Sequence, residues 1–306
     1  MVIQSMKGLY EVGKGLPARR VAVVHPYDQT VLEALGEGAA LGLCQPILLG
    51  ARNIIEKAAS LADFSLEGVK VLDIPDGQEA AHRGARLVRD GEADMIMKGL
   101  ASTAQVIRGV LAKENELRTG SLLSHITALQ VPDYHKLVYI TDAGININPD
   151  LSGKVEIVKN AIKALQSLGI RRPKVAVIAA IEHVNPAMQS GIDAALLSKM
   201  GDRGQLGEAM VDGPLSLDLA LINEVAGKKG VPGEVAGDAD LLLISNVETA
   251  NILCKVFMKW AHAPAAGCVI GAKCPVALLS RVDSKENRLN SLAFARALTV
   301  SAGYNP

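Results

Sequence analysis

The stretch VAVVHPYDQTVLEALGEGAALGLCQPILLG, residues 21–50, decides the fold class of this chain. Residues 21–26 form a short apolar run that ends in a turn, and Asp28 is a residue type that favours a helix N-cap. Residues 46–50 form a second apolar run. We predict a buried strand, a helix to about Leu43 and a second strand. Such a β-α-β unit belongs in a parallel sheet that is covered by helices.

The same alternation continues along most of the chain. We expect further strands at residues 69–74, 93–97, 174–180, 208–211, 240–244, 268–270 and 276–279, and helices at residues 78–90, 103–112, 155–167, 191–200, 215–226, 249–260 and 285–300. The apolar runs at 122–130 and 137–141 differ, because the Pro132-Asp133 turn between them indicates an antiparallel hairpin. The pattern predicts a doubly wound α/β sheet that is mostly parallel and mixed in its middle.

Length and composition restrict the class of protein. The chain has 306 residues, which at about 150 residues per domain indicates two domains. Hydrophobic residues make up 49% and aromatic residues only 3%, so Ala, Val, Ile and Leu must build the cores, as in buried parallel sheets. Acidic and basic residues balance at 32 each. Nothing in this charge balance indicates binding to nucleic acid or to an anionic membrane.

The cysteines and the apolar runs bear on the compartment. Cys44, Cys254, Cys268 and Cys274 form no C-x-x-C pair and no common zinc spacing. We expect free, mostly buried thiols and no metal site. Residues 1–14 are mixed and polar, unlike a secretory signal, and no apolar run approaches the about 18 residues that span a bilayer. We therefore expect a soluble, cytoplasmic protein.

Polar side chains follow many of the predicted strands, where ligands of open α/β sheets bind. The candidate site residues are Lys98, Ser102, Thr103, Arg108, Asp142, Asn146, Glu182, Asn246, Ser280 and Arg281. A Ser-Arg pair after a strand can hydrogen-bond an oxyanion and clamp a phosphate or a carboxylate.

Each candidate also has an ordinary structural explanation. Ser102, Thr103 and Ser280 are residue types that cap helices. Arg108 can form a surface pair on its helix, and the loop after Asp142 can contain Asx turns. The residues alone leave both explanations open.

Several motifs in a fixed order resemble the phosphate acetyl/butyryl transferase family. They are Lys98-Gly99-Leu100 through Arg108, His125-Ile126-Thr127 through Asp142-Ala143-Gly144-Ile145-Asn146-Ile147-Asn148-Pro149, Val211-Asp212-Gly213-Pro214-Leu215-Ser216-Leu217-Asp218, Asn246 to Asn251 followed by Lys255, and Leu279-Ser280-Arg281. The resemblance covers nearly the whole chain from about Ala18. Met97-Lys98-Gly99-Leu100 and Ile140-Thr141-Asp142-Ala143 are more similar to the phosphate butyryltransferase branch than to the acetyl branch.

The resemblance implies an isocitrate/isopropylmalate dehydrogenase-like fold, with two α/β domains and a cleft between them. The first domain would contain residues 1–120 and 270–306. The second, which makes the usual dimer contact, would contain residues 121–269. Ser280 and Arg281 would lie at the cleft, where the chain crosses back. The expected assembly is a homodimer or a higher homo-oligomer.

The resemblance also implies a reaction, acyl-CoA plus phosphate giving acyl phosphate plus CoA, with a butyryl or related short chain. Acyl-CoA and phosphate would be substrates that react directly in a ternary complex, without a permanently bound cofactor. Ser280 would stabilise the transition state, and Arg108 and Arg281 would bind phosphate or the phosphates of CoA. The substrate-binding residues would be Lys98, Ser102, Thr103, Asp142, Asn146, Glu182 and Asn246.

One position departs from the family pattern. Seven residues after the serine, the acetyl branch has an aspartate proposed as a base, and this chain has Asn287, which takes no proton at neutral pH. Either Asp283 or Glu286 substitutes, or phosphate, already an anion, needs little help from a base. The last explanation is the one we favour.

Two other functions stay open at this point. One is a metal- and NAD-dependent hydroxyacid dehydrogenase on the same fold, with Asp142, Asp212 and Asp218 as candidate metal ligands. The other is a non-catalytic CoA-binding protein. The departure from the family pattern at Asn287 keeps this function open.

Overall fold

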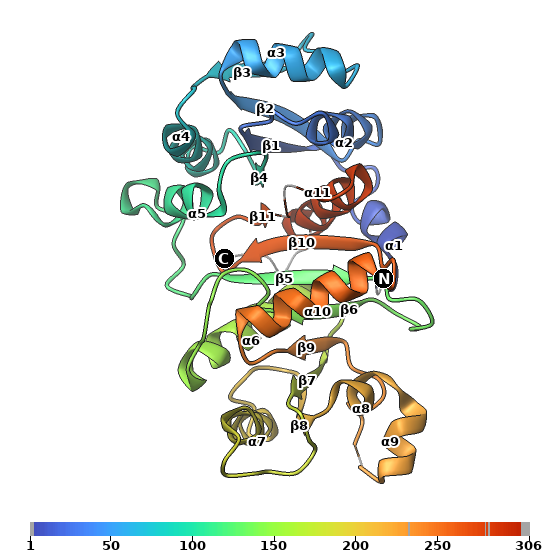
Figure 1. The fold of residues 1–306 in the computed structure, drawn as a ribbon. Coiled ribbons are helices and arrows are strands. Elements are labelled where there is room, and N and C mark those ends of the chain that lie inside the picture. Colours follow the sequence, from blue (N-terminus) through green and yellow to red (C-terminus); the bar gives the residue numbers. More distant parts are fainter. Residues whose placement is uncertain (1–2, 232, 279, 281, 301–306) are drawn as a thin grey trace. The chain divides into compact units, whose positions relative to one another are not determined.

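The structure is a computed structural model that describes residues 3–231, 233–278, 280 and 282–300 (Figure 1). The chain divides into two compact units. The N-terminal unit comprises Lys7–Ser121 and Ala266–Pro306, and the middle unit comprises Met1–Met6 and Leu122–Ala265.

The strands of the N-terminal unit follow the order β3-β2-β1-β4-β11-β10. Their bounds are β1 (Arg19–Val24), β2 (Cys44–Gly50), β3 (Lys70–Asp73), β4 (Met95–Lys98), β10 (Ala265–Ile270) and β11 (Val276–Ala277). Neighbouring strands pair in parallel, except that β10 and β11 are antiparallel. Residues 21–24 of β1 and 95–97 of β4 are apolar and buried, as expected for the centre of a sheet with helices on it.

The helices of this unit are α1 (Met6–Glu11), α2 (Gln29–Ala40), α3 (Arg52–Leu61), α4 (Gly77–Arg89), α5 (Thr103–Leu111) and α11 (Lys285–Val300), with a short 3₁₀ helix at Lys113–Asn115. Asp28 caps α2, because its carboxylate accepts the backbone N–H of Thr30, and Asp76 caps α4 through Glu79. The cap predicted at Asp28 is therefore confirmed.

The strands of the middle unit follow the order β5-β6-β9-β7-β8. They are β5 (Ser124–Leu129), β6 (Val138–Thr141), β7 (Lys174–Ile178), β8 (Met210–Leu215) and β9 (Leu241–Leu243), and the helices are α6 (Leu151–Ser167), α7 (Gln189–Asp202), α8 (Leu217–Leu221), α9 (Asn223–Lys229) and α10 (Val247–Lys259). Strands β5 and β6 form the expected antiparallel hairpin, and the remaining neighbours are parallel. The α/β class and the mixed sheet are confirmed.

Several elements differ from the sequence prediction, among them α1, where no helix was predicted. The helix expected at residues 215–226 is two helices, α8 and α9, because Ile222 between them has an extended backbone with φ −118°. Helix α2 ends at Ala40, since Gly42 adopts a φ of +69° that turns the chain toward β2. Helix α3 was not predicted at all. It begins after Ala51, which makes no side-chain cap, so the sequence carries no helix-start signal there.

The expectations on thiols and membrane spans can be compared with the structure directly. All four cysteines are buried and free, as predicted. Burial raises the pKa of Cys44 to about 12 and that of Cys254 to about 11. In the part of the chain that the structure describes, no helix combines the length and the apolar character needed to cross a bilayer.

A buried ion pair joins α6 to α7. Lys154 Nζ lies 2.5 Å from Asp193 Oδ2, and each side chain is only 6% exposed. Gln189 Nε2 donates to Asp193 Oδ1 at 2.8 Å, so the carboxylate has partners on both oxygens. Removing one charge of such a pair leaves the other buried without compensation.

We expect Lys154→Met to lower the free energy of unfolding by about 3–5 kcal/mol, because the charge of Asp193 stays buried. The double variant Lys154→Met/Asp193→Leu removes both charges and should recover most of this loss. Urea unfolding at neutral pH measures both values. The control is Lys199→Met, which breaks an exposed pair with Asp202 and should cost no more than about 1 kcal/mol. Equal losses in the single and double variants would contradict the prediction.

Candidate functional site

The N-terminal unit has a topological switch point between β1 and β4. The chain runs from β1 to β2 and β3 on one side and then places β4 on the other side of β1. The register pairs Val24 with Lys98 and Met97 with Ala277, so the residues after β1, β4 and β11 reach the same edge of the sheet. Open α/β sheets bind ligands outside the carboxyl ends of their strands at such a point.

Lys98 is the last residue of β4 and is held tightly against the loop after β1. Its side chain is buried, and its Nζ donates to the carbonyl of Gly99 at 3.1 Å. The N–H of Gly99 donates to Val24 O, and the N–H of Leu100 donates to His25 O. A Cβ at Gly99 would lie 2.1 Å from the oxygen of His25, so only glycine permits this approach of the two loops.

The β4–α5 loop contains three of the predicted site residues. Ser102 is the N-cap of α5 and forms a capping box with Gln105, which confirms its structural explanation. Thr103 is the first residue of the helix. Arg108 lies one turn further on, is exposed, and forms no ion pair with any residue that the structure describes. Its guanidinium is therefore open to an anion from solvent.

Ser280 lies in a turn that follows β11, and its side chain is exposed. Its backbone N–H donates to Asp283 Oδ2 at 2.7 Å, and the N–H of Asp283 donates back to Ser280 O at 3.3 Å. The cap of α11 is Ser284, whose Oγ accepts the N–H of Asn287. Ser280 is therefore not a helix cap. Arg281 lies outside the described residues.

A buried arginine on α11 lies against Asp28 in the loop after β1. Arg288 is 2% exposed, and its Nη2 lies 3.7 Å from Asp28 Oδ1. Burial lowers the pKa of Arg288, while the carboxylates of Asp28 and Asp283 act in the opposite direction. Strands β1 and β11 lie on either side of β4. The guanidinium thus faces the carboxylate of Asp28 in the loop after β1, and the charge of Asp283 also acts on it.

The two carboxylates considered as substitutes for the missing base, Asp283 and Glu286, have different environments in the structure. Asp283 is buried and accepts the N–H of Ser280, so it holds the turn. Glu286 lies exposed in the first turn of α11. Asn287 is half-buried on the same turn, and its carbonyl accepts the hydroxyl of Ser291.

In the middle unit, Asp142 and Asn146 organise the loop after β6. Asp142 is buried, and its Oδ1 accepts the N–H groups of Gly144 and Ile145 at 2.8 and 3.0 Å. Its Oδ2 accepts the N–H and the Nδ2 of Asn146 at 3.2 and 2.6 Å. Asn146 Nδ2 also donates to Leu123 O. The geometry gives both side chains a positioning role in this loop.

Glu182 and Asn246 follow β7 and β9, which are neighbours in the sheet. Glu182 Oε2 lies 3.4 Å from Lys229 Nζ, which also lies 3.6 Å from Asp218 Oδ2. Asn246 is the N-cap of α10, with its Oδ1 accepting the N–H of Thr249. Contact of either residue with substrate stays a prediction.

The alternative function, a metal- and NAD-dependent dehydrogenase, requires a set of metal ligands. Asp142, Asp212 and Asp218 do not form a ligand set: within the described residues, no group of three His, Cys, Asp or Glu side chains is placed to hold a metal ion. Burial raises the pKa of Asp212, although a hydrogen bond from Gly213 opposes this.

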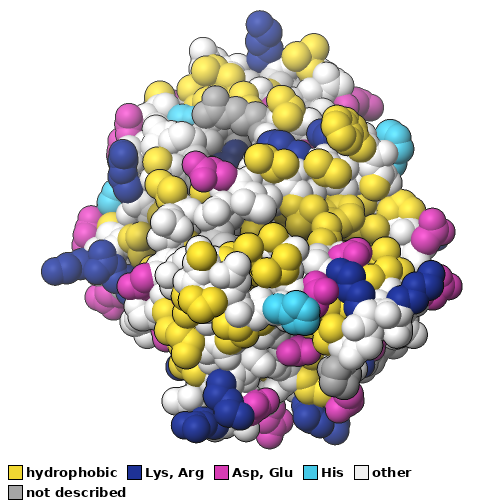
Figure 2. Space-filling view, turned by 60° about the horizontal axis from the view of Figure 1, so that its bottom comes forward, with side chains coloured by type: hydrophobic (Ala, Val, Ile, Leu, Met, Phe, Trp, Pro, Cys, Tyr) yellow, Lys and Arg dark blue, Asp and Glu magenta, His cyan; other side chains and the backbone are white. Residues whose placement is uncertain are grey.

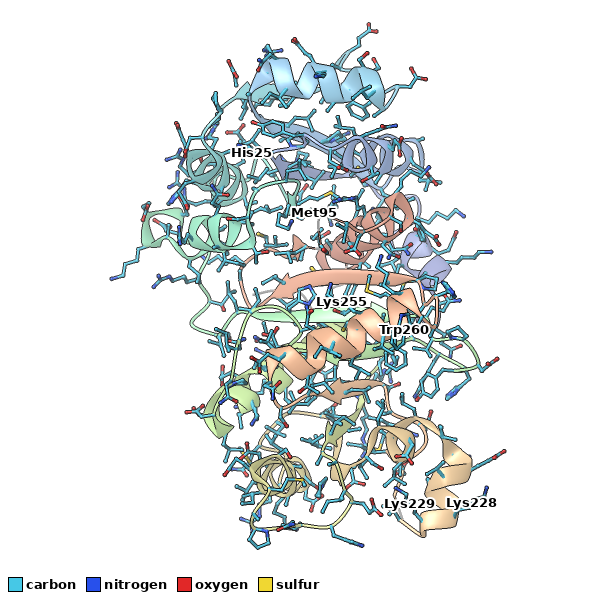
Figure 3. All side chains as sticks on the ribbon, viewed as in Figure 1. His25, Met95, Lys228, Lys229, Lys255 and Trp260 are labelled. Carbon is cyan, nitrogen blue, oxygen red and sulfur yellow. The ribbon has the colours of Figure 1, made fainter. Side chains whose placement is uncertain are left out.

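Sequence reasoning missed the parts of the site that depend on distant contacts. Arg288 was assigned no role, and Asp28 was interpreted only as a cap. His25 was placed in a turn, yet its left-handed backbone, with φ 53°, carries the carbonyl that accepts Leu100 N–H. Its ring stacks on Tyr27 at 4.5 Å and lies on the α4 side of the unit (Figure 3). The one sequence signal for this contact between loops was Gly99, which directly follows a predicted strand.

Comparison with known proteins agrees with the motifs. Residues 76–296 match the family described as phosphate acetyl/butaryl transferase. A phosphate butyryltransferase of Clostridium acetobutylicum is 40% identical over 96% of this chain and 98% of its own length. A phosphate acetyltransferase of Rhizobium meliloti is 39% identical over 89% of this chain and 86% of its own.

A solved structure extends this likeness to the fold. The crystal structure of a branched-chain phosphotransacylase from Enterococcus faecalis V583 superposes with a TM-score of 0.82. It is 30% identical in sequence, and the match covers 92% of this chain and 99% of that one. The chain therefore belongs to the phosphate acetyl/butaryl transferase family.

Proposed function

We propose that this protein transfers a short acyl group between CoA and inorganic phosphate. The observation that carries the proposal is family membership over nearly the whole chain, with identities near 40% to enzymes of this reaction. Acyl-CoA and phosphate are substrates, and the proposal includes no permanently bound cofactor. A butyryl or related short chain is the expected acyl group.

The proposed reaction is a direct attack in a ternary complex. A phosphate oxygen forms a bond to the thioester carbonyl carbon, and the carbonyl electron pair moves to oxygen. When this oxyanion collapses, the C–S bond breaks, and the electron pair leaves with the sulfur as CoA thiolate. Catalysis then requires positioning of phosphate against the carbonyl and stabilisation of the oxyanion.

We assign these tasks to the edge of the N-terminal unit described above. The hydroxyl of Ser280 donates to the oxyanion, from a turn whose backbone is fixed by Asp283. Arg108 binds phosphate or the phosphates of CoA, supported by its exposure and its lack of an ion pair with the described residues. The same role for Arg281 rests on the family resemblance alone.

Phosphate supplies its own nucleophile in this proposal. It is an anion at neutral pH, so the Asn287 position needs no base. Asp283 acts as a positioning residue, because its carboxylate is buried and holds the N–H of Ser280. This arrangement accounts for an active enzyme without an aspartate at position 287.

The wider arrangement also rests on the resemblance. We propose that the two units are the two domains of an isocitrate/isopropylmalate dehydrogenase-like enzyme, and that residues of the middle unit complete the substrate site. These would be Asp142 and Asn146 through their loop, together with Glu182 and Asn246. A homodimer or higher homo-oligomer in the cytoplasm is part of the same proposal.

The proposal predicts phosphate-dependent release of CoA from acetyl-, propionyl- or butyryl-CoA. Thiol release and acyl phosphate, trapped as the hydroxamate, should appear in equal amounts. No thiol release with any of the three substrates would refute the transferase. Oxidation of a hydroxyacid with NAD and a divalent metal would instead favour the dehydrogenase. Tight CoA binding without turnover would favour the binding protein.

Ser280→Ala should lower kcat by about 100-fold with little change in KM, because it removes a contact made to the oxyanion. Ser284→Ala is the matched control: it removes the cap of α11 and should cost about 1 kcal/mol of stability while leaving most of the turnover. Turnover of Ser280→Ala near that of the unmodified protein would rule out its catalytic role.

Comparing Asp283→Asn with Asp283→Ala tests whether Asp283 is a positioning residue or a base. Asparagine keeps an oxygen that accepts the N–H of Ser280, so kcat should stay within about tenfold, whereas alanine should lose about 100-fold. The pH profile of kcat should be the same in Asp283→Asn as in the unmodified protein. Equal losses in both variants, with a changed pH profile, would show that Asp283 is the base. Glu286→Gln is the exposed control and should leave the profile unchanged.

A further inference from the structure

The residue that follows β1 has an unusual backbone conformation. His25 has a φ of 53°, a left-handed value that residues with a side chain rarely adopt. It is half-buried, unlike the charged side chains that are interspersed over the face shown in Figure 2. A left-handed residue persists where its surroundings fix it, and such residues cluster at functional sites. The contacts of His25 therefore indicate which loops hold it and what it holds in turn.

Two neighbouring loops fix the side chain of His25 and that of Tyr27 beside it. The two rings stack with their centroids 4.5 Å apart and their planes 24° from parallel. Burial lowers the pKa of His25, while hydrogen bonds from its ring to the backbone of Pro75 and Ile74, just after β3, act in the opposite direction. The hydroxyl of Tyr27 accepts the N–H of Ala51, just after β2, at 2.6 Å. The stacked pair is thus bound to the loops that follow β2 and β3.

Glycines near the ends of β2, β3 and β4 make room for this pair. A Cβ at Gly50 would lie 2.6 Å from Cε1 of Tyr27, and one at Gly77 would lie 2.9 Å from Cε1 of His25. A Cβ at Gly99 would collide with the carbonyl of His25. The three strand ends approach His25 and Tyr27 this closely because none of these positions has a side chain.

The carbonyl of His25 binds the β4–α5 loop. It accepts the N–H of Tyr27 within its own turn and the N–H of Leu100, both at 2.8 Å. Leu100 lies two residues after Lys98. A right-handed or extended φ at His25 would turn this carbonyl away from Leu100, because rotation about the N–Cα bond moves the carbonyl group with it.

The same ring borders the group that holds the far end of this loop. Gln105 Oε1 accepts the N–H of Ser102 at 2.9 Å and completes the capping box of α5. Gln105 Nε2 would lie 2.7 Å from a Cβ at Gly77, the same position that lies 2.9 Å from His25 Cε1. The amide and the imidazole therefore pack against Gly77 together. Residues 98–103 are held near both of their ends by groups that surround His25.

We propose that His25 is a positioning residue of the acyl-transfer site: the loops after β2 and β3 fix its left-handed backbone, and its carbonyl sets the position of residues 98–103. The effect on catalysis rests on the proposed function, in which Arg108 binds phosphate on the helix that this loop begins. A misplacement of about 1 Å in a binding group can cost about 100-fold in rate. His25 acts through its backbone, so its imidazole needs no contact with substrate.

Two substitutions of His25 differ in the backbone that they allow. Asparagine is one of the side chains that tolerate a left-handed φ, and its amide can donate to the backbone after β3, whereas β-branched valine disfavours this φ. We expect kcat/KM for phosphate to fall about 30-fold in His25→Val and less than about threefold in His25→Asn. His262→Val is the matched control, because His262 has the same φ of 53° and lies exposed in the middle unit. It should lose similar stability in urea and keep its activity.

A substitution on α4 tests the contact with the ring. Gly77→Ala pushes a methyl group against His25 and Gln105, and it should lower kcat/KM about tenfold. Gly84→Ala lies in the same helix, where its Cβ would be 3.5 Å from Val24 Cγ2, an ordinary contact. This control should stay within about threefold of the unmodified protein.

Hydrogen exchange of the amides of residues 99–103 measures the position of the loop without any assay of activity. Exchange should be about tenfold faster in His25→Val, and unchanged in His25→Asn and His262→Val. Equal losses of activity in His25→Asn and His25→Val, a loss in His262→Val as large as in His25→Val, or unchanged exchange in His25→Val would each overturn the proposal. If the unmodified protein releases no CoA, the proposed reaction is refuted, and the exchange rates alone then decide whether His25 positions this loop.

Discussion

The pairing of β4 between β1 and β11 is the constraint on which the rest of the N-terminal unit's site depends. It brings Lys98, the loop after Val24 and the turn of Ser280 to one edge of the sheet, although they come from both ends of the chain. Gly99 makes the pairing possible at close range, because any side chain there would collide with the carbonyl of His25. Catalytic residues carried by rigid strand ends keep their positions better than residues on long loops.

Buried charge holds the flanking loops in place. Arg288 lies beside Asp28 and is hidden from solvent, where opposite charges such as those of Asp28 and Asp283 act on it more strongly than at the surface. A buried arginine is stabilising only when its partners stay fixed, and here both partners have a second task. Asp28 caps α2, and Asp283 holds the N–H of Ser280. The same few groups therefore serve the fold and the geometry of the site.

Most of the fold could be predicted from the sequence because its signals are local. The spacing of the apolar residues predicted the strands, and the cap residue Asp28 predicted the start of α2. The Pro132-Asp133 turn predicted the hairpin. Helix α3 was missed because it starts without a capping side chain. The break at Ile222 could not be foreseen either, since nothing in the residues around it is a helix breaker.

The site was less predictable, for a physical reason. Ser102 and Asn246 have residue types that serve equally well as helix caps and as ligands, and only the structure shows the cap. Asp142 could be a substrate ligand or the start of an Asx turn, and only the structure shows that neighbouring N–H groups occupy both of its oxygens. The role of Arg288 depends on Asp28, which is far away in the sequence, so no local pattern could reveal it.

The burial of every cysteine has a consequence for a protein that handles thioesters. Acyl groups pass readily from one thiolate to another, so an accessible thiolate would compete with phosphate for the acyl group of CoA. Burial raises the pKa of Cys44 to about 12, so its thiol stays protonated at neutral pH, and burial also denies it contact with the substrate. The chain thus resists self-acylation, and the thioester keeps phosphate as its acceptor.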